Sequence, residues 1–321
     1  MSSKKSKFSI FIIFLLITLI VLIGSSESFT YSKVKNNTKF YKVAEGSSLY
    51  SVIEDLALEP IPKLLLKIYL KNNSINLAQA GLYHLQNKSW REFLSSVSKG
   101  DVAIFKLQIP AGKNLFELED IILELNLTYD CINFECLDKR FRFIEGTLNP
   151  DTYFYKDSAS LANILRVSQD QFFNLSTSIW SNRNIDLPLK SLSEAIILAS
   201  IVEKEAGNDE EKAIIAGVFL HRLSIGMRLQ ADPTIIYGLM PDFNGDITKA
   251  NLIDKNNLYN TYQIQGLPPT PISTISKSSL EAVILGMPND YLYFVAKGDG
   301  THKFSKTYKE HLDAVKKYQL N

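Results

Sequence analysis

An almost unbroken apolar run near the N-terminus, FSIFIIFLLITLIVLI at residues 8–23, most constrains how this chain can fold. Its length of roughly sixteen residues lies at the lower edge of what a membrane-spanning helix needs and above the apolar core of a usual signal peptide. Lys4, Lys5 and Lys7 precede the run, and such a basic flank favours the cytoplasmic side for that end. Residues 25–28, SSES, contain no clean small-x-small cleavage site. The pattern therefore predicts an uncleaved anchor, with a cleaved signal peptide as the alternative.

This anchor sets the predicted topology. We expect a cytoplasmic tail over residues 1–7, a transmembrane helix over 8–24 and a polar linker over 25–39. No second apolar run of similar length follows, so the rest of the chain is expected to be soluble on the far side of the membrane. The predicted location is the inner (plasma) membrane, crossed once, with a periplasmic or otherwise extracytoplasmic domain.

Charge and cysteine content narrow the classes of function. A net charge of +1 over 321 residues gives no bulk electrostatic attraction to nucleic acid, so no nucleic-acid partner is predicted. The four histidines are scattered, and no phosphate-binding or dinucleotide-binding motif is present, so we expect neither a metal nor a cofactor. Cys131 and Cys136 are the only cysteines. An exported location permits a disulfide between them, and the sequence leaves open whether it forms.

After the linker, a strand, a glycine turn and an amphipathic helix are predicted twice. The first unit runs from the strand FYKV through Gly46 into a helix, and the second runs from FKLQI through Gly112 into another. Between them we expect a short strand near residue 82 and a helix capped by Ser89. The first unit resembles LysM modules, which bind glycans that contain N-acetylglucosamine. Residues 40–100 are therefore predicted to form a LysM-like subdomain, which either binds glycan or only supports the fold.

The remaining residues, 101–321, predict a larger mixed domain. Helices are expected over residues 161–180 and, apolar nearly all round and hence buried, over 211–223. The strand YLYFV at 291–295 and a partner at 302–304 predict a β-hairpin, followed by a helix from about residue 305. The predicted fold class is α+β: an N-terminal transmembrane helix, the small LysM-like strand-helix subdomain, and a mixed catalytic domain with buried central helices and a C-terminal β-hairpin.

The stretch LSEAIILASIVEKEA, residues 192–206, is rich in helix-forming residues and is predicted to be a helix. One of its glutamates lies where this helix should be apolar. With each residue advancing by about 100°, Glu205 falls about 20° from Leu198, inside the apolar stripe. Glu203 falls about 140° from Leu198, on the polar side, so only Glu205 is expected to be buried. Burial raises the pKa of a carboxyl and suits it to act as a general acid. The alternative is a helix-end glutamate that reaches solvent or pairs with a basic side chain.

Several polar segments between residues 198 and 272 suit a groove for a ring-shaped polar ligand such as a sugar. The loop RLQADP carries Arg, Gln and Asp in close succession, and Asp232 is predicted to cap a short helix whose first residue is Pro233. The run YNTY brings together four side chains that can form hydrogen bonds. Taken singly, each of these residues is equally well explained by turn formation or capping.

Five blocks of this sequence carry a family resemblance: EGTLNPDTY, LASIVEKEAG, GVFLHRLSIGMRLQADPTIIYGL, YNTYQIQGLPPTPIS and YLYFVAKGDGTHKFSKTYKEH. In this order they resemble the endolytic murein transglycosylases of the MltG (YceG-like) family, over roughly residues 40–318. The resemblance implies a lytic transglycosylase that cuts the β-1,4 bond from N-acetylmuramic acid to N-acetylglucosamine within nascent, uncrosslinked glycan strands. The cut is not hydrolytic and leaves 1,6-anhydro-muramyl ends. Its expected biological role is to terminate glycan strand elongation.

The resemblance also implies site residues and partners. The second glutamate of the VEKE block, Glu205, is the expected catalytic residue, in agreement with its position on the helix. Candidates for substrate binding are Gln230, Asp232, Asn260, Thr261, Tyr262 and, with less support from the motifs, Glu145. The expected partners are peptidoglycan strands and, at the membrane, peptidoglycan synthases.

Two other hypotheses about function compete with that of a lytic enzyme. The first is a non-catalytic, membrane-anchored peptidoglycan-binding protein in which the LysM-like unit carries the function. The second is a hydrolytic muramidase, which needs a second carboxylate beside Glu205. Asp232 and Glu145 are the obvious choices for that carboxylate.

Overall fold

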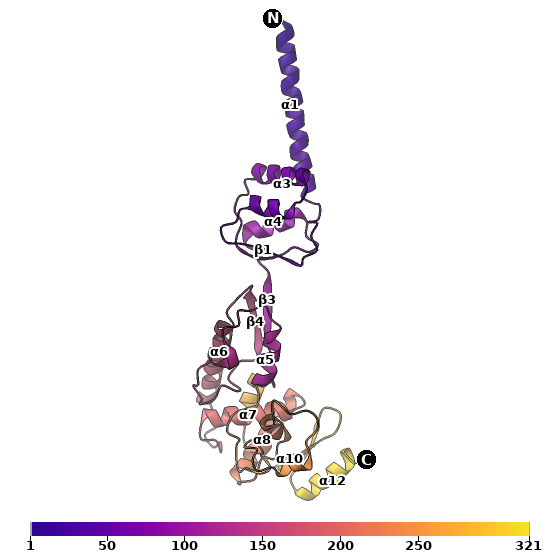
Figure 1. Ribbon diagram of the computed structural model, residues 1–321. Helices are drawn as coiled ribbons and strands as arrows, with labels where there is room; N and C mark the ends of the chain where they lie inside the picture. The colour runs from indigo at the N-terminus through magenta and orange to yellow at the C-terminus, as the bar shows by residue number, and fades with distance from the viewer. Residues whose placement is uncertain (1, 321) are drawn as a thin grey trace. The chain divides into compact units, whose positions relative to one another are not determined.

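The computed structural model describes residues 2–320 and shows a chain of helices with short two-stranded sheets, which confirms the predicted α+β class (Figure 1). Met1 of the predicted tail lies outside the described residues, as do the side chains of residues 2–6, Lys4 and Lys5 included. The chain forms two compact units. Unit 1 contains the chain up to Phe105 together with Phe154–Ala159, and unit 2 contains Lys106–Tyr153 and the chain from Ser160 onward.

The apolar run forms a long helix, as predicted. Helix α1 spans Ser2–Phe29, and its segment Lys7–Phe29 is long and apolar enough to cross a membrane. The helix therefore continues past residue 24, where the sequence predicted that it would end. Its apolar side chains are exposed on all sides of the helix.

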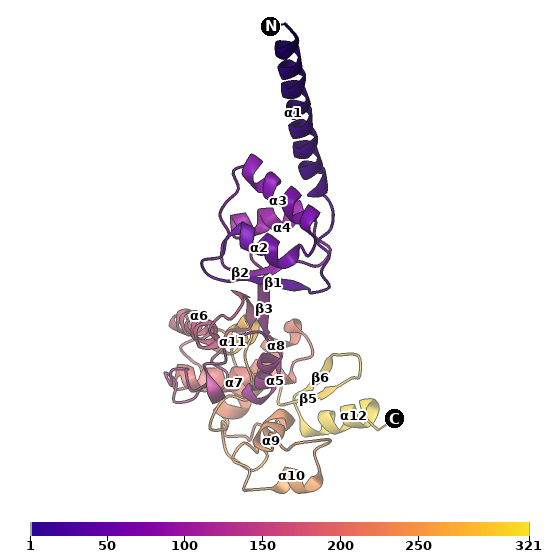
Figure 2. The same cartoon turned by 45° about the horizontal axis from the view of Figure 1, so that its top comes forward.

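Unit 1 is built on the first strand-turn-helix motif. Strand β1 (Phe40–Val43) pairs antiparallel with β2 (Gly81–His84), so that Tyr41 lies opposite Tyr83. Three helices pack over this pair: α2 (Leu49–Leu56), α3 (Pro60–Asn72) and α4 (Trp90–Lys99) (Figure 2). The Ser89 side chain accepts a hydrogen bond from the Glu92 N–H, which confirms the predicted cap. Helix α3 was not predicted, because lysines break up its apolar face.

The second strand-turn-helix motif is also present. Strand β3 (Ile104–Ile109) leads through Gly112 into helix α5 (Leu115–Leu123) and forms a two-stranded sheet with β4 (Asp151–Lys156). The chain between α5 and β4 is irregular except for one 3₁₀ turn, Ile132–Phe134. A disulfide joins Cys131 and Cys136 beside this turn, which settles the pairing that the sequence left open.

Unit 2 has a helical core. Helix α7 (Leu192–Glu205) packs against α6 (Leu161–Ser181), α8 (Asp209–Ser224) and α11 (Lys277–Ile284). The middle of α7 is buried all round, because Ala195, Leu198, Ile201 and their neighbours are covered by these helices. Two short helices, α9 (Asp232–Gly238) and α10 (Lys249–Ile253), flank the core.

The predicted C-terminal hairpin is present. Strand β5 (Tyr293–Ala296) pairs antiparallel with β6 (His302–Ser305), and helix α12 (Tyr308–Tyr318) follows. Helix α12 begins three residues later than predicted, because Ser305 still pairs with Tyr293 in the hairpin and Thr307 caps the helix instead.

Candidate active site

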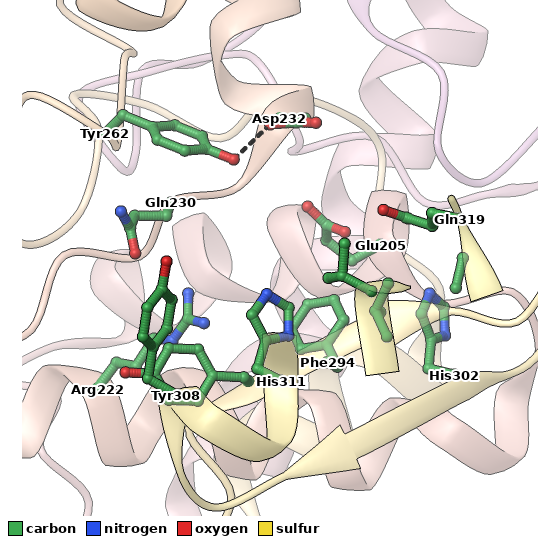
Figure 3. A pocket seen from close by; sticks show the side chains of 14 residues that line it. Glu205, Arg222, Gln230, Asp232, Tyr262, Phe294, His302, Tyr308, His311 and Gln319 are labelled. Carbon is green, nitrogen blue, oxygen red and sulfur yellow. Dashed lines mark hydrogen bonds between the residues drawn. The ribbon is translucent and has the colours of Figure 1, made fainter. Parts of the chain in front are cut away.

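A cavity of about 460 Å³ lies in unit 2 where the C-terminal end of α7 faces the hairpin and α12 (Figure 3). Its volume is in the range of small-ligand sites. Four of the candidate residues line it: Glu205, Gln230, Asp232 and Tyr262. The folded chain thus brings together side chains that lie up to 57 positions apart in sequence (262 − 205).

Glu205 is the last residue of α7 and presents its carboxyl to this cavity (Figure 3). The side chain is only partly exposed, in agreement with its predicted place in the apolar stripe. Burial raises the pKa of Glu205 to about 8, the negative charge of Asp232 adds to the shift, and the Arg222 guanidinium opposes it. At neutral pH the carboxyl is therefore mostly protonated and able to donate a proton.

Asp232 and Tyr262 form one side of the cavity. The Tyr262 hydroxyl donates a hydrogen bond of 2.7 Å to Asp232 Oδ1, drawn in Figure 3. Asp232 was predicted to cap α9, but it is the first residue of the helix, Ala231 stands at the capping position, and no side chain caps this end. The prediction was wrong because the Asp232 carboxylate bonds to Tyr262 rather than to the N–H groups of its own helix.

Gln230 reaches the cavity from a strained loop. Its backbone lies in the left-handed region, with φ of 51°, which is uncommon for residues other than glycine. The backbone N–H of Gln230 donates to the Thr261 carbonyl at 3.1 Å and so holds this conformation. Strain of this kind, fixed by surrounding hydrogen bonds, is typical of functional loops.

Asn260 and Thr261, two further candidates, are fully buried and do not line the cavity. The Asn260 amide donates to three backbone carbonyls, the shortest bond being 2.8 Å to Asp254. The Thr261 hydroxyl accepts the Ala231 N–H at 2.9 Å. Both residues therefore hold the loops that carry Gln230, Asp232 and Tyr262, and a direct contact of either one with substrate stays a prediction.

Glu145 lies elsewhere in unit 2, buried at 4% exposure, and does not line this cavity. Its carboxylate accepts the Leu115 and Gly146 N–H groups and the Tyr237 hydroxyl, each at 3.0 Å. Burial raises the pKa of Glu145 to about 7, and these hydrogen bonds oppose the shift. The bonds tie the start of α5 to α9, and a role of Glu145 in substrate binding stays a prediction.

Glu203 corrects the expectation that only Glu205 would be buried. The Glu203 side chain is 9% exposed and forms an ion pair of 3.4 Å with Lys212, itself 8% exposed. It also accepts the Ser276 N–H at 3.0 Å and the Ser279 hydroxyl at 2.6 Å. The helical wheel failed here because α8 and α11 cover the face of α7 that it marked as polar. The two glutamates thus differ in pairing, since Glu203 is neutralised by Lys212 while Glu205 faces the cavity.

The opposite wall of the cavity comes from residues that the sequence did not single out: Arg222 of α8, four residues of β5, His302 of β6, and Tyr308, His311, Val315 and Gln319 from α12 and its end. The Arg222 Nε donates to the Leu292 carbonyl at 2.8 Å, so the guanidinium fastens the hairpin to α8. His302 is held by Glu211 through its backbone N–H and its Nδ1, each at 2.8 Å. The GVFLHRL and YLYFV…HKF blocks contain most of these residues, but nothing in their spacing indicated that they face Glu205.

His311 is the most distinctive residue of this wall. Its ring stacks on Tyr293 with centroids 5.2 Å apart, and its Nδ1 is buried without a hydrogen-bond partner among the described residues. Burial and the nearby Arg222 charge lower the pKa of His311, so the ring is neutral at physiological pH.

The arrangement supplies one protonated carboxyl among aromatic rings, amides and a fixed cation. Aromatic faces and amide groups suit sugar rings and their hydroxyl and N-acetyl substituents. Among residues 2–320, no cluster of three or more histidine, cysteine or acidic side chains has the arrangement of a metal site. The residues at the cavity therefore fit acid–base chemistry on a polar, ring-shaped substrate.

Comparisons with known proteins show the family to which this chain belongs. A profile described as the YceG-like family matches residues 41–317. An endolytic murein transglycosylase of Bacillus subtilis is 28% identical, over 92% of this chain and 89% of the relative. One from Streptococcus pneumoniae is 27% identical over 81% of this chain and 55% of its own longer sequence. The crystal structure of a YceG-like protein from Listeria monocytogenes matches with a TM-score of 0.55 and 27% identity, over 85% of this chain and 97% of that one. The chain belongs to the YceG-like family.

Proposed function

We propose that this protein is an endolytic murein transglycosylase with Glu205 as its catalytic acid and base. The observation that carries the proposal is the Glu205 carboxyl, whose pKa is raised by burial, in a cavity of unit 2 lined by polar and aromatic side chains. Relatives named as endolytic murein transglycosylases match over most of the chain and support the same substrate class. The bond cleaved is the β-1,4 link from N-acetylmuramic acid to N-acetylglucosamine within an uncrosslinked strand.

The reaction needs one carboxyl used twice. Glu205 donates its proton to the glycosidic oxygen as the bond from C1 of the muramyl residue to that oxygen breaks, and the N-acetylglucosamine hydroxyl leaves. The C6 hydroxyl of the same muramyl residue then bonds to C1, and the Glu205 carboxylate takes the C6 hydroxyl proton. The 1,6-anhydro ring closes, Glu205 is protonated again, and no water is consumed.

The cavity residues have distinct roles in this scheme. Asp232, fixed by Tyr262, keeps the pKa of Glu205 high through its negative charge and therefore acts as a positioning residue. Gln230 offers an amide to sugar hydroxyl or N-acetyl groups from its strained loop. Arg222 stabilises the Glu205 carboxylate after the first proton transfer.

A hydrolytic muramidase is the second candidate, because Asp232 provides a second carboxylate in the same cavity. In a hydrolase this group would activate water or attack the sugar. The two candidates differ in product. Full-length protein in detergent is incubated with uncrosslinked glycan strands, and the released ends are weighed by mass spectrometry. The lytic reaction gives anhydro-muramyl ends, whose mass is one water molecule lower than that of hydrolysed ends. Reducing muramyl ends with the mass of the hydrolysed product would favour the muramidase. Binding without any cleavage would favour the non-catalytic anchor protein.

We further propose that α1 anchors the protein in the inner (plasma) membrane, with the N-terminus in the cytoplasm and the chain that follows α1 outside. The length and composition of α1 and the lysines that precede its apolar run support this topology. In such a location the enzyme would meet strands as synthases release them, and cleavage would terminate elongation. Residues 40–100, the LysM-like subdomain, would then either bind nascent glycan or only support the fold beside the membrane. Residues 101–321 would form the catalytic domain.

A further inference from the structure

Unit 1 carries an exposed apolar surface on helix α3, beside the end of α1. Leu58, Ile61 and Leu64 are 86%, 71% and 55% exposed. Ile61 and Leu64 lie on one face of α3, and Leu58, which precedes the helix, lines a groove together with Pro62 of α3. The opposite face buries Leu66, Tyr69 and Leu70 in the core of unit 1. Apolar side chains gathered on one face of a surface helix mark an interaction site rather than core packing.

The end of α1 is fixed against this surface. Glu27 in the last turn of α1 accepts a hydrogen bond of 2.9 Å from Asn73, which follows α3, and lies 3.3 Å from Arg91 of α4. Helices α1 and α3 are in contact, and both Figures 1 and 2 show α3 at the end of unit 1 from which α1 extends. The direction of α1 relative to unit 1 is therefore set by side-chain bonds as well as by the chain connection.

If α1 spans a membrane, the length of the helix would place its junction with α3 at the membrane surface. At 1.5 Å per residue, about 20 residues cross the ~30 Å hydrocarbon core, so a span that enters at Lys7 leaves it near Glu27. Phe29, the last residue of α1, lines a groove of about 200 Å³ together with Leu58 and Pro62. With α1 across a bilayer, the start of α3 would thus lie at the depth of the lipid headgroups.

Basic side chains accompany the apolar ones. Lys33 and Lys35 line the same groove. Lys63 and Lys67 follow one flank of α3, where both pair with Glu54, and Lys71 continues that row. An apolar face bordered by lysines is the pattern of a helix that lies in the membrane interface, with its lysines directed to lipid phosphates.

We propose that α3 and the adjoining groove form a second membrane-contact surface, which seats unit 1 on the outer leaflet of the phospholipid bilayer. Leu58, Ile61 and Leu64 enter the boundary between headgroups and acyl chains, and Lys33 and Lys35 meet lipid phosphates. The contact adds to the single span of α1 and fixes the orientation of unit 1 toward the membrane. It rests on the proposed role of α1 as a membrane anchor, and the experiment below separates the two.

The test uses tryptophan fluorescence of the full-length chain in nanodiscs of phosphatidylcholine and phosphatidylglycerol. The acyl chains of these lipids carry bromine at positions close to the headgroups. Bromine quenches tryptophan only on close approach. The test variant is Ile61→Trp. The matched control is Ile104→Trp, an exposed isoleucine at the start of β3, whose neighbour Ala103 bonds to Leu82 of β2 rather than to α1 or α3. Leu16→Trp in α1 reports insertion, and the parent spectrum corrects for Trp90 and Trp180.

We expect the added fluorescence of Ile61→Trp and Leu16→Trp to be largely quenched and that of Ile104→Trp to be unchanged. Quenching of Leu16→Trp without quenching of Ile61→Trp would overturn the α3 contact alone. If Leu16→Trp were also unquenched, the anchor itself would be wrong. As an independent readout, the α3 amides should exchange hydrogen several-fold faster in Ile61→Ser/Leu64→Ser than in the parent in the same nanodiscs, and equal rates would contradict the contact.

Discussion

The electrostatic coupling between Asp232 and Glu205 makes the most specific kinetic prediction. Because the free enzyme must carry a protonated Glu205, kcat/KM should fall as pH rises through about 8, the pKa of this carboxyl. The Asp232→Asn substitution removes a negative charge that raises this pKa. At an effective dielectric of about 20, a unit charge about 10 Å away contributes on the order of 1–2 kcal/mol, or about one pKa unit. The alkaline limb of the pH profile, where kcat/KM falls with rising pH, should therefore move from about pH 8 to about pH 7.

The magnitude follows from the fraction of protonated enzyme. At pH 8 about half of the parent keeps its proton, against roughly one in ten of Asp232→Asn, so the variant should retain a roughly fivefold smaller fraction of its own plateau activity. The assay measures the release of anhydro-muramyl ends at low substrate concentration from pH 5 to pH 10. Loss of a substrate contact would lower the plateau without moving the limb, so the position of the limb isolates the electrostatic effect.

Tyr262→Phe provides the matched control. It removes the hydrogen bond to Asp232 but leaves the Asp232 charge in place, so its limb should not move to lower pH. The reasoning would be refuted by a limb in Asp232→Asn at the same pH as in the parent. It would also be refuted if Tyr262→Phe and Asp232→Asn shifted the limb downward to the same extent.

Three further predictions concern stability. Glu203→Gln breaks the buried pair with Lys212 and should cost about 2–4 kcal/mol by thermal melting, while kcat/KM of the folded enzyme stays near the parent value; a large loss of kcat/KM at full stability would contradict this. Glu205→Gln should instead stabilise the protein by about 2–3 kcal/mol at pH 7, because the raised native pKa makes the ionised carboxyl destabilising as pH climbs from 4.5 towards 8. That gain should shrink towards pH 4.5, and a gain independent of pH would argue against the raised pKa. Replacing both Cys131 and Cys136 by serine should lower stability by about 2 kcal/mol or less, since the loop that the disulfide closes is short, and activity should be retained.

Local features of the fold followed well from the sequence. The apolar run predicted α1, the two strand-glycine-helix motifs predicted β1 with α2 and β3 with α5, and the block at 291–304 predicted the β5–β6 hairpin. These signals are short-range, since periodicity and turn residues act over a few positions. Helices α3 and α11 escaped prediction because each is short or carries lysines and serines within its apolar pattern.

The predicted burial of Glu205 depended on one helix and agrees with the structure, whereas the predicted exposure of Glu203 depended on neighbouring helices and was wrong. The position of Glu205 in the apolar stripe needed only the helical period. The burial of Glu203 depends on α8 and α11, which cover a face that the period alone marks as polar. The wall of Arg222, His302 and His311 depends on how the hairpin packs against α8, and such long-range packing has no signature in local spacing.

The most direct test of the account compares Glu205→Gln with Glu203→Gln in one assay. Full-length parent and variants are incubated with uncrosslinked glycan strands, and 1,6-anhydro-muramyl ends are counted by mass spectrometry. Since a glutamine in place of Glu205 keeps the shape of the side chain but has no carboxyl proton to donate, the account predicts that anhydro ends fall by at least about a hundredfold in Glu205→Gln, with Glu203→Gln close to the parent. Release of anhydro ends by Glu205→Gln at the parent rate would contradict the assignment of Glu205 as the catalytic acid and base.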